Sequence, residues 1–385
     1  MASIKKTFKI LILLTLACIS ALHAERIGFD NFNFLSIDFP QGFQLSECNS
    51  EGTSFLLENT IFPVTSLVRI YTDGRYKDCH SALTSTFTRL NASNADVDSV
   101  KWRNQNCAIA GFDIELSSLQ YSGYACAVPL SESKDILVCL VYTLSKDAAS
   151  YNSFMVSLID SICIDRGSYT ENGIMTEYLY PKSKNIVKTV LTINGQQIET
   201  FIKDNDEEAA DYVVDREYDV LKLYAASSQW KEAWIRYYRM IYRDSYGRLS
   251  RVSFDIYNAL SSSCNDETDL AQKILTWTQD FPYERNKNKA DFTNIPSVIM
   301  GHGSDCDSRS MLVAILLNSW NQDAIMMISR VYSHALCGMT STHKGHSFRY
   351  NNKDYLMGET TQKGLTWGKI AQNQDKTENW IFIDF

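Results

Sequence analysis

The sequence predicts an α+β protein: short alternating apolar segments typical of strands come first, a stretch with helical apolar spacing follows, and further strands lie near the C-terminus. At 385 residues the chain exceeds one usual compact core, so we expect two globular units. Hydrophobic residues make up 45% and charged residues 21%, which is typical of a globular chain. We expect a signal peptide at 1–24, an N-terminal α+β domain at 25–166, a linker with a β-hairpin at 167–205 and a second domain at 206–385.

The N-terminus has the pattern of a secretory signal. Three lysines precede an apolar run at 10–19, and small residues continue to Ala24. The run is shorter than the roughly 20 residues that span a bilayer, so we expect cleavage and export to the periplasm, the cell surface or the medium. Cys18 could instead mark a lipoprotein cleavage site, and only then would we expect membrane attachment.

Charge and missing motifs exclude several functions. Without 1–24 the chain has 34 basic and 45 acidic side chains, a net charge of −11 that should repel nucleic acid and anionic lipid. Phosphate-binding loops, Cys-x-x-Cys pairs and His-Glu-x-x-His helices are absent from the sequence. His302, His343 and His346 lack metal-ligand spacing, and the acidic cluster at 204–208 suits a helix start better than a metal site. We expect neither a metal nor an organic cofactor.

The cysteine count suggests one unpaired thiol. Nine of the ten cysteines follow the signal peptide, and an odd count in an exported protein leaves one without a partner. Six of the nine precede residue 170, so the N-terminal domain could hold up to three disulfides. The count alone leaves open whether Cys306 is the free thiol or a half-cystine.

The N-terminal domain should combine strands with two helices. Apolar segments predict strands at 32–39, 64–71, 107–116 and 136–142. Helical spacing predicts helices at 79–90 and around 154–162. This order of elements loosely resembles that of PsbP-like domains.

The middle of the chain should contain a hairpin and then helices. Strands at 186–193 and 196–202 flank Asn194-Gly195, which suits a two-residue type I′ turn. Helices should dominate from 207 to 279, where aromatic residues recur at helical spacing. We interpret this aromatic stripe as a buried helix face in preference to a sugar-binding shelf. Its members are Trp230, Trp234, Tyr237, Tyr238, Ile241 and Tyr242.

The segment from Gly301 to Ser310 carries the first candidate for chemistry. Two glycines permit a tight loop, and the apolar run at 311–317 predicts a buried helix directly after it. Cys306 would lie at the start of that helix, where the positive end of the helix dipole favours a thiolate. This is a position that suits a nucleophilic cysteine.

Strands after this helix carry a candidate base and a candidate acid. We expect strands at 324–329 and 331–337, with His334 on the second. A further pair at 346–350 and 355–361 would carry Glu359. Neighbouring strands lie about 4.8 Å apart, so His334 and Glu359 could form a hydrogen bond.

Three motifs resemble those of the bacterial transglutaminase-like superfamily over about 266 to 370. In chain order they are Gly-x-x-x-Asp-Cys-Asp-x-Arg-Ser, Ser-His-Ala and Tyr-Leu-x-x-Glu-Thr-Thr. The resemblance implies a papain-like core with Cys306 as nucleophile, His334 as base and Glu359 as orienting acid. Glutamate stands where the family usually has aspartate, which leaves Asp354 as an alternative acid. Gln279 is a candidate oxyanion donor beside the backbone N–H of Cys306.

The resemblance implies an exported cysteine hydrolase or acyltransferase that acts on peptide or amide bonds through a thioester. We favour hydrolysis over crosslinking, because no pocket for an amine acceptor can be identified. The expected partner is a protein or peptide substrate, such as a cell-wall peptide. The alternative is a non-catalytic cell-envelope binding protein that keeps the fold as a scaffold.

Overall fold

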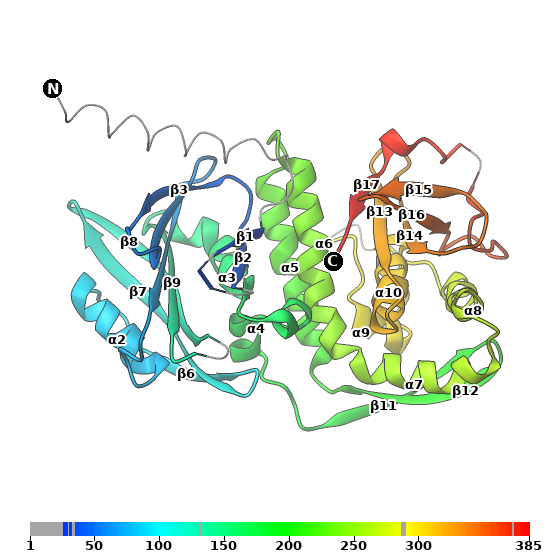
Figure 1. The fold of residues 1–385 in the computed structure, drawn as a ribbon, viewed down its shortest axis with the longest axis horizontal. Coiled ribbons are helices and arrows are strands. Elements are labelled where there is room, and N and C mark those ends of the chain that lie inside the picture. The colour runs from blue at the N-terminus through cyan, green and yellow to red at the C-terminus, as the bar shows by residue number, and fades with distance from the viewer. Residues whose placement is uncertain (1–25, 30, 33–34, 131–132, 286–289, 372) are drawn as a thin grey trace.

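The computed structural model describes residues 26–29, 31–32, 35–130, 133–285, 290–371 and 373–385. The expected signal peptide and Cys18 lie outside these ranges. Helices and sheets are both abundant, which confirms the predicted α+β class. Figure 1 shows two halves, each with its own sheet, on either side of the long helices α5 (Asp206–Leu223) and α6 (Trp230–Arg248). Over the described ranges, every helix is too short or too polar to cross a membrane.

A seven-stranded antiparallel sheet forms the centre of the N-terminal half. Its strands, in hydrogen-bonded order, are β3 (Phe43–Cys48), β4 (Ser54–Asn59), β5 (Val64–Tyr71), β9 (Ile136–Leu144), β8 (Leu119–Pro129), β7 (Gln105–Leu116) and β6 (Asp98–Trp102). A smaller sheet contains β1 (Arg26–Gly28), β2 (Ser36–Asp38) and β10 (Ile162–Cys163). The sequence predicted four of these strands and missed the others, whose apolar alternation is weaker. The predicted strand at 32–39 is reduced to β2.

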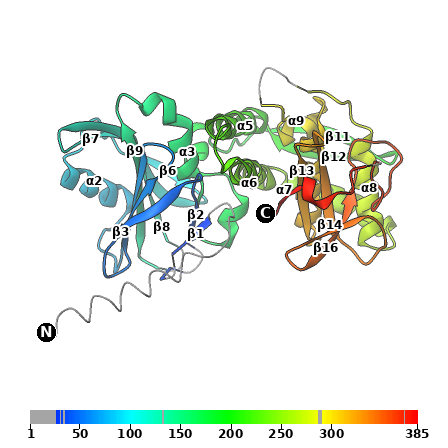
Figure 2. The same cartoon turned by 90° about the horizontal axis from the view of Figure 1, so that it is seen from above.

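Helices cover both faces of the large sheet. On one face, α2 (Cys79–Leu90) packs through Leu83 and Phe87. On the other face lie α3 (Asn152–Asp160) and side chains from α5 and α6, among them Val220 and Ala233. The view from above in Figure 2 places α5 and α6 between the two halves. These two helices therefore complete the core of the N-terminal half.

The C-terminal half surrounds one buried helix, α10 (Cys306–Ser319). All its residues from Ser308 to Leu317 are buried, as the apolar sequence predicted. One side of α10 faces a five-stranded sheet in the order β15 (Ser347–Tyr350), β16 (Lys353–Gly358), β14 (His334–Thr340), β13 (Ala324–Ser329) and β17 (Ile381–Ile383). The helices α6, α7 (Ser250–Leu260), α8 (Glu267–Gln279) and α9 (Ile295–Met300) also contact α10.

The predicted hairpin is present as β11 (Ile186–Ile193) and β12 (Gln196–Lys203). Asn194 and Gly195 have φ of 50° and 79°, which fits the two left-handed positions of a type I′ turn. Alternate residues of the hairpin lie in the C-terminal core; these are Leu191, Ile193, Ile198 and Ile202. The hairpin of the predicted linker thus packs as part of the C-terminal half, whereas Ile174 and Met175 of the same segment lie in the core of the N-terminal half. The remaining short helices are α4 (Ile174–Leu179) and the 3-10 turns at 148–151, 166–170, 261–263 and 377–379.

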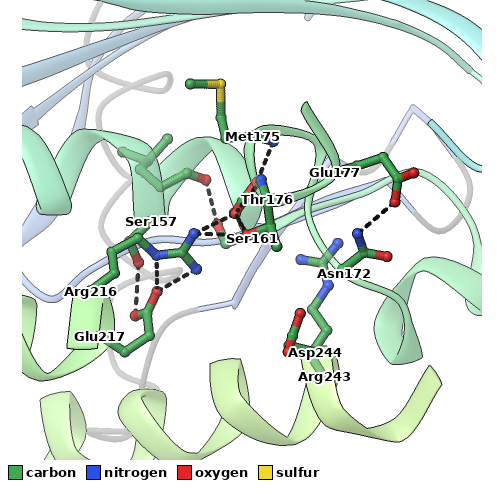
Figure 3. A network of polar contacts seen from close by, with 12 residues as sticks. Ser157, Ser161, Asn172, Met175, Thr176, Glu177, Arg216, Glu217, Arg243 and Asp244 are labelled. Atoms are coloured by element: carbon green, nitrogen blue, oxygen red, sulfur yellow. Dashed lines mark hydrogen bonds and ion pairs between the residues drawn. The ribbon is translucent and has the colours of Figure 1, made fainter. Parts of the chain in front are cut away.

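A buried network of charged groups joins the N-terminal half to α5 and α6 (Figure 3). Arg216 pairs with Asp160 of α3 and with Glu217, where its Nε lies 2.8 Å from Oε1. Arg236 of α6 donates to Ser157 at 2.8 Å and to Glu217 at 3.1 Å. These side chains are almost completely buried, so each charge depends on its partners instead of on water.

Candidate active site

The nucleophile candidate lies at the first residue of α10. Asp305 is the N-cap: its carboxylate accepts the Ser308 N–H at 2.7 Å, while the Ser308 hydroxyl accepts the Asp305 N–H at 3.1 Å. Gly301 and Gly303 have φ of 87° and 80°, so the loop before the helix is as tight as the sequence predicted. This reciprocal cap fixes where the helix begins and therefore where the Cys306 sulfur points.

The structure brings the candidate base and acid together. His334 opens β14 opposite Ser329, and its Nε2 lies 2.7 Å from Oε2 of Glu359. The strand begins later than predicted, because residues 330–333 form the turn from β13 and Ser333 has φ of 49°. Glu359 lies just beyond the end of β16, not within a strand. The alternative acid, Asp354, is exposed and pairs with Arg349.

Several donors hold the Glu359 carboxylate in place. Its Oε1 accepts the Thr361 N–H at 2.8 Å and the Thr361 hydroxyl at 2.5 Å. Burial opposes ionisation of this group, but the hydrogen bond and charge of His334, together with the Thr361 donors, hold its pKa below the ordinary value. Glu359 is therefore an ionised, oriented acceptor for the imidazole.

Gln279, the predicted oxyanion donor, has another task. Its side-chain amide donates to the carbonyl of Glu359 at 2.8 Å and to that of Leu365 at 3.0 Å, and its Oε1 accepts the Gly364 N–H at 3.1 Å. Both amide hydrogens are thus engaged with backbone carbonyls, which leaves neither of them for an oxyanion. In this geometry Gln279 positions the segment that carries Glu359 and is not a free oxyanion donor.

The Cys306 sulfur keeps its proton at neutral pH, whereas the sequence led us to expect a thiolate stabilised by the helix dipole. It donates to Oδ1 of Asp307 at 3.2 Å, and Oδ2 of Asp307 accepts the Tyr238 hydroxyl. Burial, and after it the charge and hydrogen bond of Asp307, raise the pKa of Cys306, while the Ala335 N–H lowers it less. The prediction that Cys306 lies at a helix start is confirmed, but the sequence analysis did not predict that Asp307 would accept the thiol hydrogen bond.

Asp307→Asn should make the thiol more acidic. Removing the adjacent negative charge stabilises the thiolate, so we expect the pKa of Cys306 to fall by about one unit and alkylation near neutral pH to speed up about tenfold. The measurement is the pH profile of iodoacetamide labelling of the Cys306 peptide by mass spectrometry. Asp354→Asn, an exposed acid on the neighbouring sheet, should leave the profile unchanged. An unaltered profile in Asp307→Asn would contradict this electrostatic account.

Tyr283 is a site residue that the sequence analysis missed. Its backbone bridges to Ser304, with the Glu284 N–H donating to the Ser304 carbonyl at 3.0 Å. Burial and the adjacent Cys306 raise the pKa of Tyr283 to about 12, so its hydroxyl keeps its proton at neutral pH. A hydroxyl donor beside the sulfur, with the backbone N–H of Cys306, provides the kind of donors that an oxyanion requires.

Cys306 and His334 line one cavity of about 280 Å³. Its walls include rings of the predicted aromatic stripe, Trp234, Tyr237 and Tyr238, together with the arginines Arg285 and Arg330. Tyr237 and Tyr238 are also core residues, so the stripe serves both packing and the cavity. The cavity is therefore an apolar pocket with charged groups among its lining residues.

The cysteines and acids of the described residues suggest no other chemical centre. All nine described cysteines are free thiols, so the disulfides suggested for the N-terminal half are not formed. Cys337 is buried in the C-terminal core, which gives it a packing role. Within the described ranges, histidines, cysteines and acids form no cluster of three or more that could hold a metal ion.

Comparisons with known proteins return no family model and no curated protein that matches the sequence. Solved structures with similarity include PsbP of Synechocystis sp. PCC 6803, at TM-score 0.31 and 8% identity over 38% of this chain and 96% of that chain. The Saccharomyces cerevisiae Ran-binding protein Mog1p has TM-score 0.26 and 13% identity over 34% and 84%. A Bacteroides thetaiotaomicron protein has TM-score 0.25 and 10% identity over 83% and 85%. At these TM-scores the similarities carry no argument, so the PsbP-like and transglutaminase-like resemblances stay predictions.

Proposed function

We propose that the C-terminal half is a transglutaminase-like cysteine enzyme that breaks peptide or amide bonds through a thioester. The observation that carries the proposal is the pairing of His334 with Glu359 at 2.7 Å, with His334 and Cys306 lining the same cavity. The nucleophile comes from a helix start, the base from the first residue of β14 and the orienting acid from the residue after β16, an arrangement that fits a catalytic triad.

The proposed reaction begins with attack of the Cys306 sulfur on the substrate carbonyl carbon. His334 takes the thiol proton during the attack, because the thiol is protonated in the resting site. With Nε2 bonded to Glu359, Nδ1 is the nitrogen left for this transfer. A C–S bond forms, the C–N bond breaks, and the same proton passes from His334 to the leaving amine.

Water then attacks the thioester carbonyl, releases the acid and returns a proton to Cys306. An amine in place of water would give acyl transfer. We favour hydrolysis, since water reaches any open cavity while transfer requires a second binding site for the amine. The Tyr283 hydroxyl and the Cys306 N–H are the proposed donors to the oxyanion. The reaction needs neither a metal nor an organic cofactor.

We also propose that the protein is exported, because residues 1–24 have the pattern of a secretory signal. A substrate outside the cytoplasm, such as a protein or a cell-wall peptide, would be consistent with it. Attachment to a membrane is proposed only for a form lipidated at Cys18.

One observation favours the rival function, a binding protein that keeps this fold as a scaffold. The Cys306 thiol donates to Asp307 at 3.2 Å, and burial together with this carboxylate raises its pKa, so the thiol is less reactive than a preformed thiolate. Under this alternative, Cys306 would be no better a nucleophile than an ordinary buried thiol.

Acylation by p-nitrophenyl acetate distinguishes the two functions. We expect an acetyl group on the Cys306 peptide of the wild type, and formation of that adduct two to four orders of magnitude slower in His334→Ala, because general-base catalysis contributes a factor of this size. Mass spectrometry of the digested protein measures the adduct. His343→Ala, which removes an exposed histidine outside the cavity, is the matched control. Equal acetylation of Cys306 in wild type and His334→Ala would support the scaffold.

A further inference from the structure

Arg330 is an unusual cation at the rim of the cavity. It follows the last residue of β13 and lies four residues before His334, in the turn between β13 and β14. Its guanidinium carbon lies 5.4 Å from the ring centroid of Trp230, the first residue of α6. The side chain is exposed, and it forms no ion pair with a carboxylate of the described residues. Stacking on Trp230 holds the guanidinium while leaving its N–H donors available.

The other arginines near the site are engaged. Arg285 binds Asp291 through its Nε at 2.8 Å. Arg309 donates to the Ser304 hydroxyl at 2.8 Å and to the Phe281 carbonyl at 2.9 Å. Arg309 is thus occupied by backbone and hydroxyl acceptors, and Asp291 balances the charge of Arg285, so a negatively charged ligand in the cavity would find its unbalanced guanidinium partner at Arg330.

A row of aromatic rings leads from Arg330 toward the nucleophile. Trp230, Trp234 and Tyr238 recur every four residues on α6, with ring centroids 5.9 Å apart for the first pair and 6.5 Å apart for the second. The last ring, Tyr238, bonds Asp307 beside Cys306. Eight residues of helix advance about 12 Å, which is about the length of three to four extended peptide residues.

We propose that Arg330 binds a carboxylate of the acyl donor, and that the substrate class is an acidic peptide whose carboxylate lies two to four residues from the scissile carbonyl. This inference rests on the proposed function, because it takes Cys306 as the reacting atom. The peptide would lie along the aromatic row, with apolar groups on Trp234 and the carboxylate on the guanidinium. Such pairing is geometrically specific, because a guanidinium binds a carboxylate through two parallel hydrogen bonds.

The overall charge of the chain makes a local cation necessary for such a substrate. A net charge of −11 on the mature chain repels an acidic peptide at long range. Asp305 and Asp307 are acids that line the cavity beside Cys306. An acidic substrate would therefore bind with its carboxylate away from these acids, at the end of the row where Arg330 lies.

Iodoacetylated glycine peptides test this inference without knowledge of the natural substrate. The probes are iodoacetyl-glycine, iodoacetyl-diglycine and iodoacetyl-triglycine, each as the free acid and as the uncharged C-terminal amide. The readout is the ratio of acid to amide labelling rates at the Cys306 peptide, measured by mass spectrometry. We expect the acid to react about fivefold faster for the longer probes and no faster for iodoacetyl-glycine, as an exposed ion pair of the right span predicts.

Arg330→Gln should abolish this preference, and Arg349→Gln should keep it, since Arg349 is an exposed arginine outside the cavity. A ratio that is the same in wild type and Arg330→Gln would overturn the inference. A different result would contradict the proposed function itself. In that case His334→Ala would label Cys306 with the acid probes and with the amide probes at the wild-type rates.

Discussion

Arg216→Met should lower the free energy of unfolding by about 3–5 kcal/mol, the cost of leaving the buried Asp160 carboxylate without its ion-pair partner. Arg216 is 4% exposed and its partners Asp160 and Glu217 are each 1% exposed, so water cannot replace the lost ion pairs. The guanidinium also reaches the Thr176 hydroxyl at 3.1 Å, which links α4 to the same group. Equilibrium unfolding in urea, followed by tryptophan fluorescence, measures the change.

Lys222→Met on the same helix is the matched control. Lys222 pairs with Asp219, but both side chains are more than half exposed, so its loss should cost less than about 1 kcal/mol. Adding Asp160→Asn to Arg216→Met removes the stranded charge and should recover part of the lost stability, whereas Glu217 keeps its pair with Arg236. Equal destabilisation by Arg216→Met and Lys222→Met would show that the buried network contributes no more than a surface pair.

The same helices serve the network and the proposed active site. Arg236 and Arg239 of α6 bind the N-terminal half through Ser157 and Asp38. Tyr238, between them in sequence, faces the C-terminal half and bonds Asp307. A helix fixed on one side by buried charges therefore presents a fixed hydroxyl on the other side. The N-terminal half contributes to the site through this helix instead of through residues of its own.

Local signals explain what the sequence could predict. The bounds of β5, α2 and β13 agree with the predicted segments, and the hairpin at 186–203 differs by one residue, because periodicity and an Asn-Gly turn act over a few neighbours. Cys306 at a helix start follows from glycines before an apolar run. These features require no knowledge of distant contacts.

The features that the sequence could not predict depend on distant partners. Gln279 binds the carbonyl of Glu359, 80 positions away, so its role cannot be inferred from its neighbours. The proton acceptor at Asp307 is adjacent in sequence, yet its effect depends on burial against Tyr238 of another helix. Arg330 was not singled out, because an arginine in a turn is ordinary until the stack on Trp230 is seen.

Glu359→Gln should reduce the rate of acetylation of Cys306 by p-nitrophenyl acetate by two to four orders of magnitude, on the order of the loss when the acid of a catalytic triad becomes an amide. The neutral amide keeps the size of the side chain but no longer balances an imidazolium. It can also present its NH₂ to Nε2, which selects the tautomer that places a hydrogen on Nδ1. In that tautomer His334 cannot accept the Cys306 proton.

Two measurements separate this effect from a loss of folding. Glu267→Gln, an exposed acid at the start of α8, should acetylate at the wild-type rate. Glu359→Gln should also still be alkylated at high pH, because a thiolate formed by hydroxide needs no base. If Glu359→Gln acetylates at the wild-type rate near neutral pH, Glu359 is a structural acceptor for His334 and Thr361 and has no part in catalysis. If the variant is slow near neutral pH but equals the wild type at high pH, the defect is proton transfer, as the His334–Glu359 pair predicts.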